Sequence, residues 1–305
     1  MKEGEIVDWF LMDSVLGDTF YKECRTEVAE YPMAISVSSY FGLKDRYKLA
    51  EILYETYCSP SVMFVNQGRA SLRRYARTGV DVSIGAGVAC VLPVVDGKII
   101  KENIKKLNVN GNDLTNYLGQ LIAKKGISTG TELDPKYCEG VRNIDTIKAK
   151  CFLLDEYIEE STTPEQSFTF DDCTISLGKE LYQAPEPLFQ PHLIGKDCPG
   201  LAEVIHSCIS SCEVDTREQL YQNIVFSGAS SLFKNLAQRL KKELGELAPN
   251  NYKIGVTAPP ESKYSVWMGT CAEAESFYNH DKWVTREMYE EQGEAITSKF
   301  STTIC

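Results

Sequence analysis

The stretch Asn223–Leu247, NIVFSGASSLFKNLAQRLKKELGEL, predicts a strand, a turn of small residues and a helix. Ile224–Phe226 is too short for a helix and is closed by the turn signal Ser227-Gly228, which is typical of a buried strand. Beyond the turn, apolar residues at helical spacing are expected to face the core: Leu232, Phe233, Leu236, Ala237 and Leu240. Charged residues fall on the opposite face: Lys234, Arg239, Lys241 and Lys242. Gly245 is placed to end the helix.

This strand–turn–helix unit has two interpretations. Backbone N–H groups of the turn and the positive end of the helix dipole would point above the sheet, where they can hold an anion such as phosphate. An ordinary buried strand–helix unit shows the same pattern, because a single glycine turn is a weak signal. The stretch alone favours the ordinary unit, so the rest of the chain must decide.

Length, charge and cysteine content limit the class of protein. The 305 residues are enough to bury a substantial core and to form more than one domain. With 32 Lys and Arg against 43 Asp and Glu, the net charge is -11, which argues against direct binding to polyanionic DNA or RNA. No apolar run is long enough for a membrane span. The 11 cysteines include no CxxC pair, which predicts reduced thiols in the cytosol or nucleus and argues against a zinc site.

The N-terminal part predicts alternating helices and strands. A helix is expected around Met12–Arg25. Its candidate core positions are Val15, Phe20 and Cys24. The strands Met33–Val37 and Val62–Val65 flank a predicted helix, Asp45–Tyr57, and this spacing indicates a parallel pair with a crossover. Val80–Ile100 changes character, because apolar runs separated by glycine turns are typical of antiparallel hairpins.

Four motifs, one of them from the opening stretch, turn this pattern into a family resemblance. In chain order they are NGNDLTNYL (Asn110–Leu118), LFQP (Leu188–Pro191), NIVFSG (Asn223–Gly228) and APPESKYSVWMG (Ala258–Gly269). Together they closely resemble the actin family, and the resemblance is collinear from Gly4 to about Phe300. It implies an α/β fold of two lobes, each RNase H-like and related by duplication, with ATP held in the cleft between them.

The resemblance also implies a division into lobes. Residues 1–79 are expected to form the first lobe, with residues 264–305 packing back on it. Residues 80–263 are expected to form the second lobe, with an inserted subdomain at about 127–206. The family's opening strands and first phosphate hairpin have no counterpart before Gly4, so the chain is expected to be N-terminally truncated and its first lobe incomplete. A sheet left with an open edge is expected to be covered by another chain or to aggregate.

The second phosphate hairpin of the family matches Ser83–Gly87, where the family reads Asp-Ser-Gly-Asp-Gly. The glycines Gly85 and Gly87 are kept, so the backbone can still approach a phosphate. Ser83 and Ala86 replace the two aspartates that hold hydrated Mg²⁺, which argues against bound Mg²⁺ and against hydrolysis.

Two other positions bear on hydrolysis. Cys90 stands where the family has a histidine. Gln67 matches the family's water-positioning glutamine and is a weak catalytic candidate, since such a residue more often satisfies a strand end.

The base-binding side is better preserved. The resemblance places Gly111 near the ribose, Lys148 against the adenosine and Lys263 near the base. It assigns the family's Gly-Gly turn to Gly228 and Ala229, and Ser230 beside them is also expected to contact the nucleotide. Ala229 replaces the second glycine of that turn, and its methyl group is expected to crowd the nucleotide. Each lysine alone would be interpreted as a surface charge and each glycine as a turn. Taken together at family positions, they predict residual binding of ATP or ADP.

The leading functional hypothesis is an actin-like cytoskeletal or complex-forming structural subunit, with at most residual ATP or ADP binding and impaired hydrolysis. Its expected partners are actin or actin-related subunits and other cytoskeletal proteins, with no nucleic acid and no membrane. Its expected location is the cytoplasm and cytoskeleton, with the nucleus as an alternative. Two alternatives stay open: an active ATP-binding, polymerising ATPase of the actin type, and an incomplete gene product without independent function.

Overall fold

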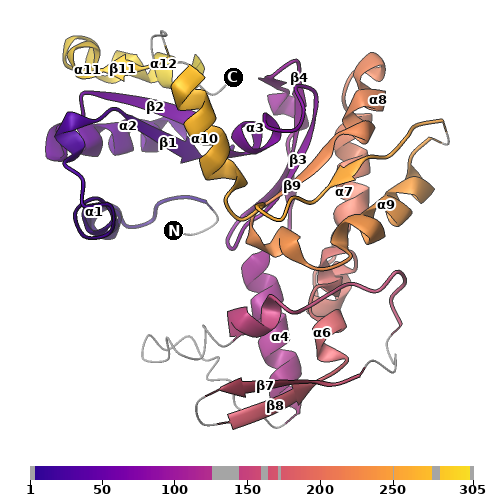
Figure 1. Ribbon diagram of the computed structural model, residues 1–305. Helices are drawn as coiled ribbons and strands as arrows, with labels where there is room; N and C mark the ends of the chain where they lie inside the picture. Colours follow the sequence, from indigo (N-terminus) through magenta and orange to yellow (C-terminus); the bar gives the residue numbers. More distant parts are fainter. Residues whose placement is uncertain are drawn as a thin grey trace. The chain divides into compact units, whose positions relative to one another are not determined.

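Two units make up the chain in the computed structural model (Figure 1). Unit 1 comprises Met1–Arg77, Asp96–Ile99 and Tyr264–Cys305, and unit 2 comprises Thr78–Val95 and Ile100–Lys263. The structure describes residues 4–125, 144–158, 164–170, 173–249, 251–276 and 282–302. The predicted insertion at about 127–206 therefore lies partly outside the described residues.

Unit 2 is built on a mixed sheet. Its central strand β3 (Gly79–Ile84) pairs antiparallel with β4 (Ala89–Val95) and parallel with β9 (Ile224–Ser227). Outer strands extend it on both sides, since β10 (Val256–Thr257) pairs parallel with β9 and β6 (Lys105–Leu107) antiparallel with β4. The predicted buried strand at 224–226 and the predicted hairpin within 80–100 are thereby confirmed.

Helices of unit 2 form where the sequence supplies both a cap and an apolar face. In α4 (Gly111–Lys124), the Asn110 side chain accepts from the amides of Asn112 and Asp113, and the Asp113 carboxylate accepts from the Asn110 amide. Leu114, Leu118 and Ile122 of this helix are buried in the unit 2 core. The other helices and the separate hairpin are α6 (Glu180–Gln183), α7 (Leu201–Ser210), α8 (Val214–Gln222), α9 (Leu236–Leu247), β7 (Gln166–Phe170) and β8 (Cys173–Leu177).

Unit 1 has its own sheet. The parallel pairing of β1 (Met33–Val37) with β2 (Ser61–Asn66) confirms the predicted crossover pair. A strand that the sequence pattern missed, β11 (Val284–Thr285), pairs antiparallel with β2. Two residues are too few to show a period, so only the pairing reveals it.

Helices cover this sheet. Figure 1 shows α10 (Ser265–Ser276) beside β1, and it also packs closely on α3 (Gln67–Leu72). Gly269 permits this approach, because a Cβ there would collide with the carbonyl oxygen of Ala70. The remaining elements are α1 (Trp9–Gly17), α2 (Leu43–Glu51), β5 (Lys98–Ile99), α11 (Arg286–Gln292) and α12 (Thr297–Thr302).

The predicted N-terminal helix differs from the observed one. It begins at Trp9 and gives way to a π-helical turn at Asp18–Glu23. Phe20 is buried as expected, whereas Val15 is 52% exposed and Cys24 is exposed, so these two core assignments were wrong. The helix is apolar on both faces, and the face that packs on the core is instead formed by the partly buried Trp9, Met12 and Leu16. A periodic pattern cannot choose between two apolar faces.

The helix of the opening stretch also differs from expectation. Ala229–Leu232 forms a 3-10 turn, Asn235 adopts a left-handed conformation, and only then does α9 begin at Leu236. Gly245 does not end this helix, which continues to Leu247. The helix therefore starts farther from the Gly228 turn than the apolar spacing predicted.

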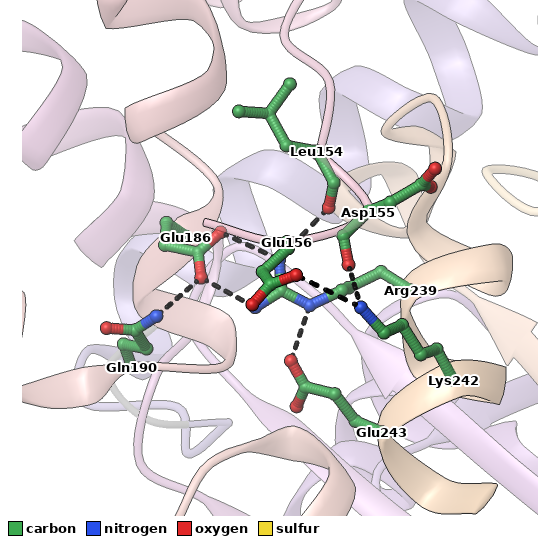
Figure 2. Close-up of polar contacts among 8 residues, drawn as sticks. All are labelled: Leu154, Asp155, Glu156, Glu186, Gln190, Arg239, Lys242 and Glu243. Carbon is green, nitrogen blue, oxygen red and sulfur yellow. Dashed lines mark hydrogen bonds and ion pairs between the residues drawn. The ribbon is translucent and has the colours of Figure 1, made fainter. Parts of the chain in front are cut away.

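The prediction that Arg239 lies on the charged outer face of the helix is wrong, because its side chain is buried among polar partners (Figure 2). Its Nη2 donates to Glu186 Oε1 at 3.0 Å, its Nη1 to the Leu154 carbonyl at 3.0 Å, and its Nε to Glu243. The guanidinium carbon lies 5.0 Å from the centre of the Phe189 ring. A charge this deeply buried is tolerated only when such partners replace its lost hydration.

Three further hydrogen bonds hold the segments around Arg239 together. The Leu153 amide donates to the Lys234 carbonyl at 3.0 Å, and Asn235 Nδ2 donates to the Leu153 carbonyl at 2.9 Å. Gln190 Nε2 donates to Glu186 Oε1 at 3.0 Å. Burial raises the pKa of Glu186 to about 7, while the Arg239 charge and hydrogen bonds act in the opposite direction.

We predict that Arg239→Met destabilises the protein by about 3–5 kcal/mol, because it leaves the Glu186 carboxylate buried without its cation. Urea unfolding measures this loss. The matched control is Lys242→Met on the same helix, whose side chain is 48% exposed and whose loss should stay within about 0.5 kcal/mol. Equal losses in the two variants would contradict this account of the cluster.

Candidate functional site

The hairpin between β3 and β4 is fixed by the start of α4. The Gly111 amide donates to the Gly85 carbonyl and the Asn112 amide to the Ala86 carbonyl, both at 2.8 Å. Within the hairpin, the Gly85 amide donates to the Val88 carbonyl at 3.0 Å. Two backbone hydrogen bonds therefore hold residues 85–86 against residues 111–112, which are distant in sequence.

The Gly228 turn packs directly on this hairpin. Gly228 has φ +88°, which favours glycine, and a Cβ there would lie 2.5 Å from the Ile84 carbonyl oxygen and 3.3 Å from the Gly85 amide nitrogen. On its other side, the Gly228 amide donates to the Ser262 carbonyl at 3.0 Å. A side chain at this position would separate the turn from the hairpin.

Ser230 and Lys148 complete the cluster from two further segments. A Cβ on Gly111 would lie 2.6 Å from Ser230 Oγ, so the serine sits against the glycine backbone. Lys148 Nζ donates to the Gly111 carbonyl at 2.7 Å and to Thr115 Oγ1 at 3.0 Å. Two of the three N–H donors of this ammonium group thus bond to the first turn of α4. Burial lowers the pKa of Lys148, and the Asp145 carboxylate opposes that shift.

The structure thus brings together most of the residues predicted to contact a nucleotide: Gly85, Gly111, Lys148, Gly228 and Ser230. Three others lie close by in sequence. Lys263 follows Ser262, which bonds to Gly228, while Ala229 is exposed and Gly87 is half-buried at the hairpin. Gln67 is in unit 1, where it is the first residue of α3.

A model of the actin family matches residues 1–301 of the 305-residue chain. The chain belongs to the actin family. The resemblance drawn from the four sequence motifs is confirmed, and so is the mixed α/β class of the fold. In the part of the chain that the structure describes, no helix is long and apolar enough to cross a membrane.

In this actin-family chain, the hairpin residues Ser83–Gly87 carry no carboxylate. Ser83 lies opposite Cys90 in the antiparallel register and beside Ser227 in the parallel one, and Ala86 is exposed at the tip. Among residues 4–125, 144–158, 164–170, 173–249, 251–276 and 282–302, no group of three or more His, Cys, Asp or Glu side chains could hold a metal ion. The hairpin itself offers backbone groups and a hydroxyl, without a carboxylate.

A carboxylate that sequence reasoning overlooked lies two residues earlier. Asp81 is fully buried in β3, and Ser227 Oγ donates to its Oδ2 at 3.1 Å. Asp81 shares a face of the sheet with Ser83, because alternate residues of a strand point the same way. The signal for it was present as a single charge inside the apolar run Val80–Ile84.

We predict that Cys90 resists alkylation in the folded protein. Burial, with a contribution from the Asp81 carboxylate, raises the pKa of the Cys90 thiol to about 12, so about one thiol in ten thousand is ionised at pH 8. Iodoacetamide at pH 8 followed by peptide mass spectrometry should label exposed Cys58 and leave Cys90 unmodified until urea is added. Equal labelling of both in the native protein would show that the sheet face is open.

Proposed function

We propose that this actin-family protein is a structural, complex-forming subunit of the cytoskeleton that retains at most residual binding of ATP or ADP. The observation that carries the proposal is a phosphate hairpin whose glycines are kept while both of its metal-associated carboxylates are replaced, at Ser83 and Ala86. The glycines let the backbone approach a phosphate, whereas the family's carboxylates hold the metal ion needed for hydrolysis.

The residues present fit a nucleotide in part. A Cβ on Gly87 would meet nothing within 4 Å, so open space lies beside the hairpin. In our proposal the amides of the hairpin and of the Gly228 turn face the phosphates, and Lys148, Gly111 and Lys263 lie toward the nucleoside. Lys148 would contribute positive charge while remaining bonded to the Gly111 carbonyl.

The same residues do not fit Mg²⁺. Hard cations need several oxygen ligands, usually with a carboxylate among them, and the hairpin has none. Asp81 does not substitute for them, since it is fully buried and accepts from Ser227. Without a metal ion at the phosphates, phosphoryl transfer loses a main source of charge stabilisation. The protein would then act through the surfaces it offers to partners.

The partners in this proposal are actin or actin-related subunits and other cytoskeletal proteins in the cytoplasm. Support comes from the sheet of unit 1, where β1 is the end strand of the described order β1–β2–β11. Four of the five β1 residues are only partly buried. A strand with one paired side has backbone groups that another chain can cover.

We predict that the purified protein hydrolyses ATP no faster than a heat-denatured control, with or without Mg²⁺. The physical reason is the absence of carboxylates from the hairpin. Phosphate release over several hours is the measurement, and Gln67→Ala is the matched variant, expected to change nothing. Turnover that requires Mg²⁺ and disappears in Gln67→Ala would establish the active-ATPase alternative instead.

We predict that any binding of ADP or ATP depends on the Gly228 turn. Gly228→Val should abolish binding of a fluorescent ATP analogue, because the new side chain meets the Ile84 carbonyl. Gly195→Val is the matched control, since Gly195 also has a positive φ, +71°, but has nothing within 4 Å of an added Cβ. Lys263→Met, at an exposed site, should weaken binding about tenfold without affecting the fold. Undiminished binding in Gly228→Val and Lys263→Met would mean that the nucleotide lies elsewhere.

A further inference from the structure

Helix α1 is apolar on two faces, of which only one packs on the core of unit 1. That face is formed by the partly buried Trp9, Met12 and Leu16. Four other large apolar side chains are far more exposed than such residues usually are: Val7, just before the helix, at 66%, and Phe10 at 84%, Leu11 at 59% and Val15 at 52% on the helix. We call these four residues the α1 strip. Single exposed apolar residues are ordinary, but four within nine consecutive residues indicate a contact surface.

The α1 strip is held in place by the inner side of the helix. Asp8 caps the helix by accepting from the Leu11 amide at 3.0 Å. Tyr57 Oη donates to the carbonyl oxygen and to Oδ1 of Asp13, with both distances 2.9 Å. The Tyr57 ring also meets Phe20 edge-on at 5.1 Å. A partner would therefore meet a preformed surface, and binding would cost little conformational entropy.

We propose that the α1 strip binds an amphipathic helix of a partner protein, whose apolar face carries basic residues along its flanks. This inference rests on the proposed function as a complex-forming subunit and names the class of partner. The helical part of the strip, Phe10–Val15, spans about 8 Å, and Val7 extends it beyond the N-terminus of α1. That length suits the i, i+3 and i+4 anchors of a helix that lies across it.

Charge around the strip selects the occupant. Residues 4–25 contain more acidic than basic side chains, namely Glu5, Asp8, Asp13, Asp18 and Glu23 against Lys22 and Arg25. Of the two basic residues in this stretch, Lys22 lies 2.7 Å from Asp18 and is neutralised by it. An acidic margin favours a basic partner and repels both an anionic membrane and a second copy of a chain with net charge -11.

The test uses the full chain and a fluorescein-labelled peptide of about 20 residues, with leucines at helical spacing and lysines on the flanks. Fluorescence anisotropy should show binding that weakens about tenfold or more in Phe10→Ser and in Leu11→Ser, because each removes a large apolar contact. Leu43→Ser is the matched control, since Leu43 is a 43% exposed leucine on α2, and it should bind like the parent. A peptide with glutamates in place of the lysines should not bind, and Glu23→Lys should weaken binding of the lysine peptide at low salt.

Four outcomes would overturn the inference. The lysine peptide fails to bind the parent, or it binds the parent, Phe10→Ser and Leu11→Ser equally. The parent sediments as a dimer that Phe10→Ser dissociates, which would assign the strip to a second copy. Phosphatidylcholine vesicles capture the parent and release Phe10→Ser, which would assign it to a lipid surface. Circular dichroism confirms folding of each variant.

The failure of this inference is distinguishable from failure of the proposed function, because ATP turnover is measured on the same preparations. Turnover together with normal peptide binding would overturn the structural role and leave the strip intact. Absence of turnover together with unchanged peptide binding in the strip variants would overturn the strip alone.

Discussion

The buried ion pair between Arg239 and Glu186 is the interaction on which unit 2 depends. It joins helix α9 to Glu186 and to the carbonyl of Leu154. A buried charge is stable only while its partners stay in place, so these segments cannot move independently. The segment of Leu154 follows Lys148 in sequence, and α9 follows the Gly228 turn. The geometry of the candidate site is therefore set partly by an ion pair outside it.

Within the site, packing and chemistry make separate demands on the sequence. Gly111 and Gly228 are required because backbone meets backbone there, whether or not a ligand is bound. The same close contacts would persist in a protein that never hydrolyses a nucleotide. Ser83 and Ala86 are under no such packing demand. The two kinds of position can therefore change independently of each other.

Unit 1 shows the complementary situation at its surface. Helix α1 packs one apolar face against the core and leaves other apolar side chains exposed between acidic residues. Strand β1, in the described sheet, is paired on one side. Neither feature contributes to phosphate chemistry. In the proposed function both would serve contact with other chains.

The sequence by itself determined the family, the α/β class, the strand at Ile224–Phe226 and the hairpin within Val80–Ile100, because these depend on local periodicity and on motifs in fixed order. It could not place Arg239, since a cation at a polar helical position looks the same whether solvent or a buried carboxylate faces it. Nor could it choose between the two apolar faces of α1, or find the two-residue strand β11. Those outcomes depend on what packs against each element, and only the tertiary structure supplies the opposing atoms.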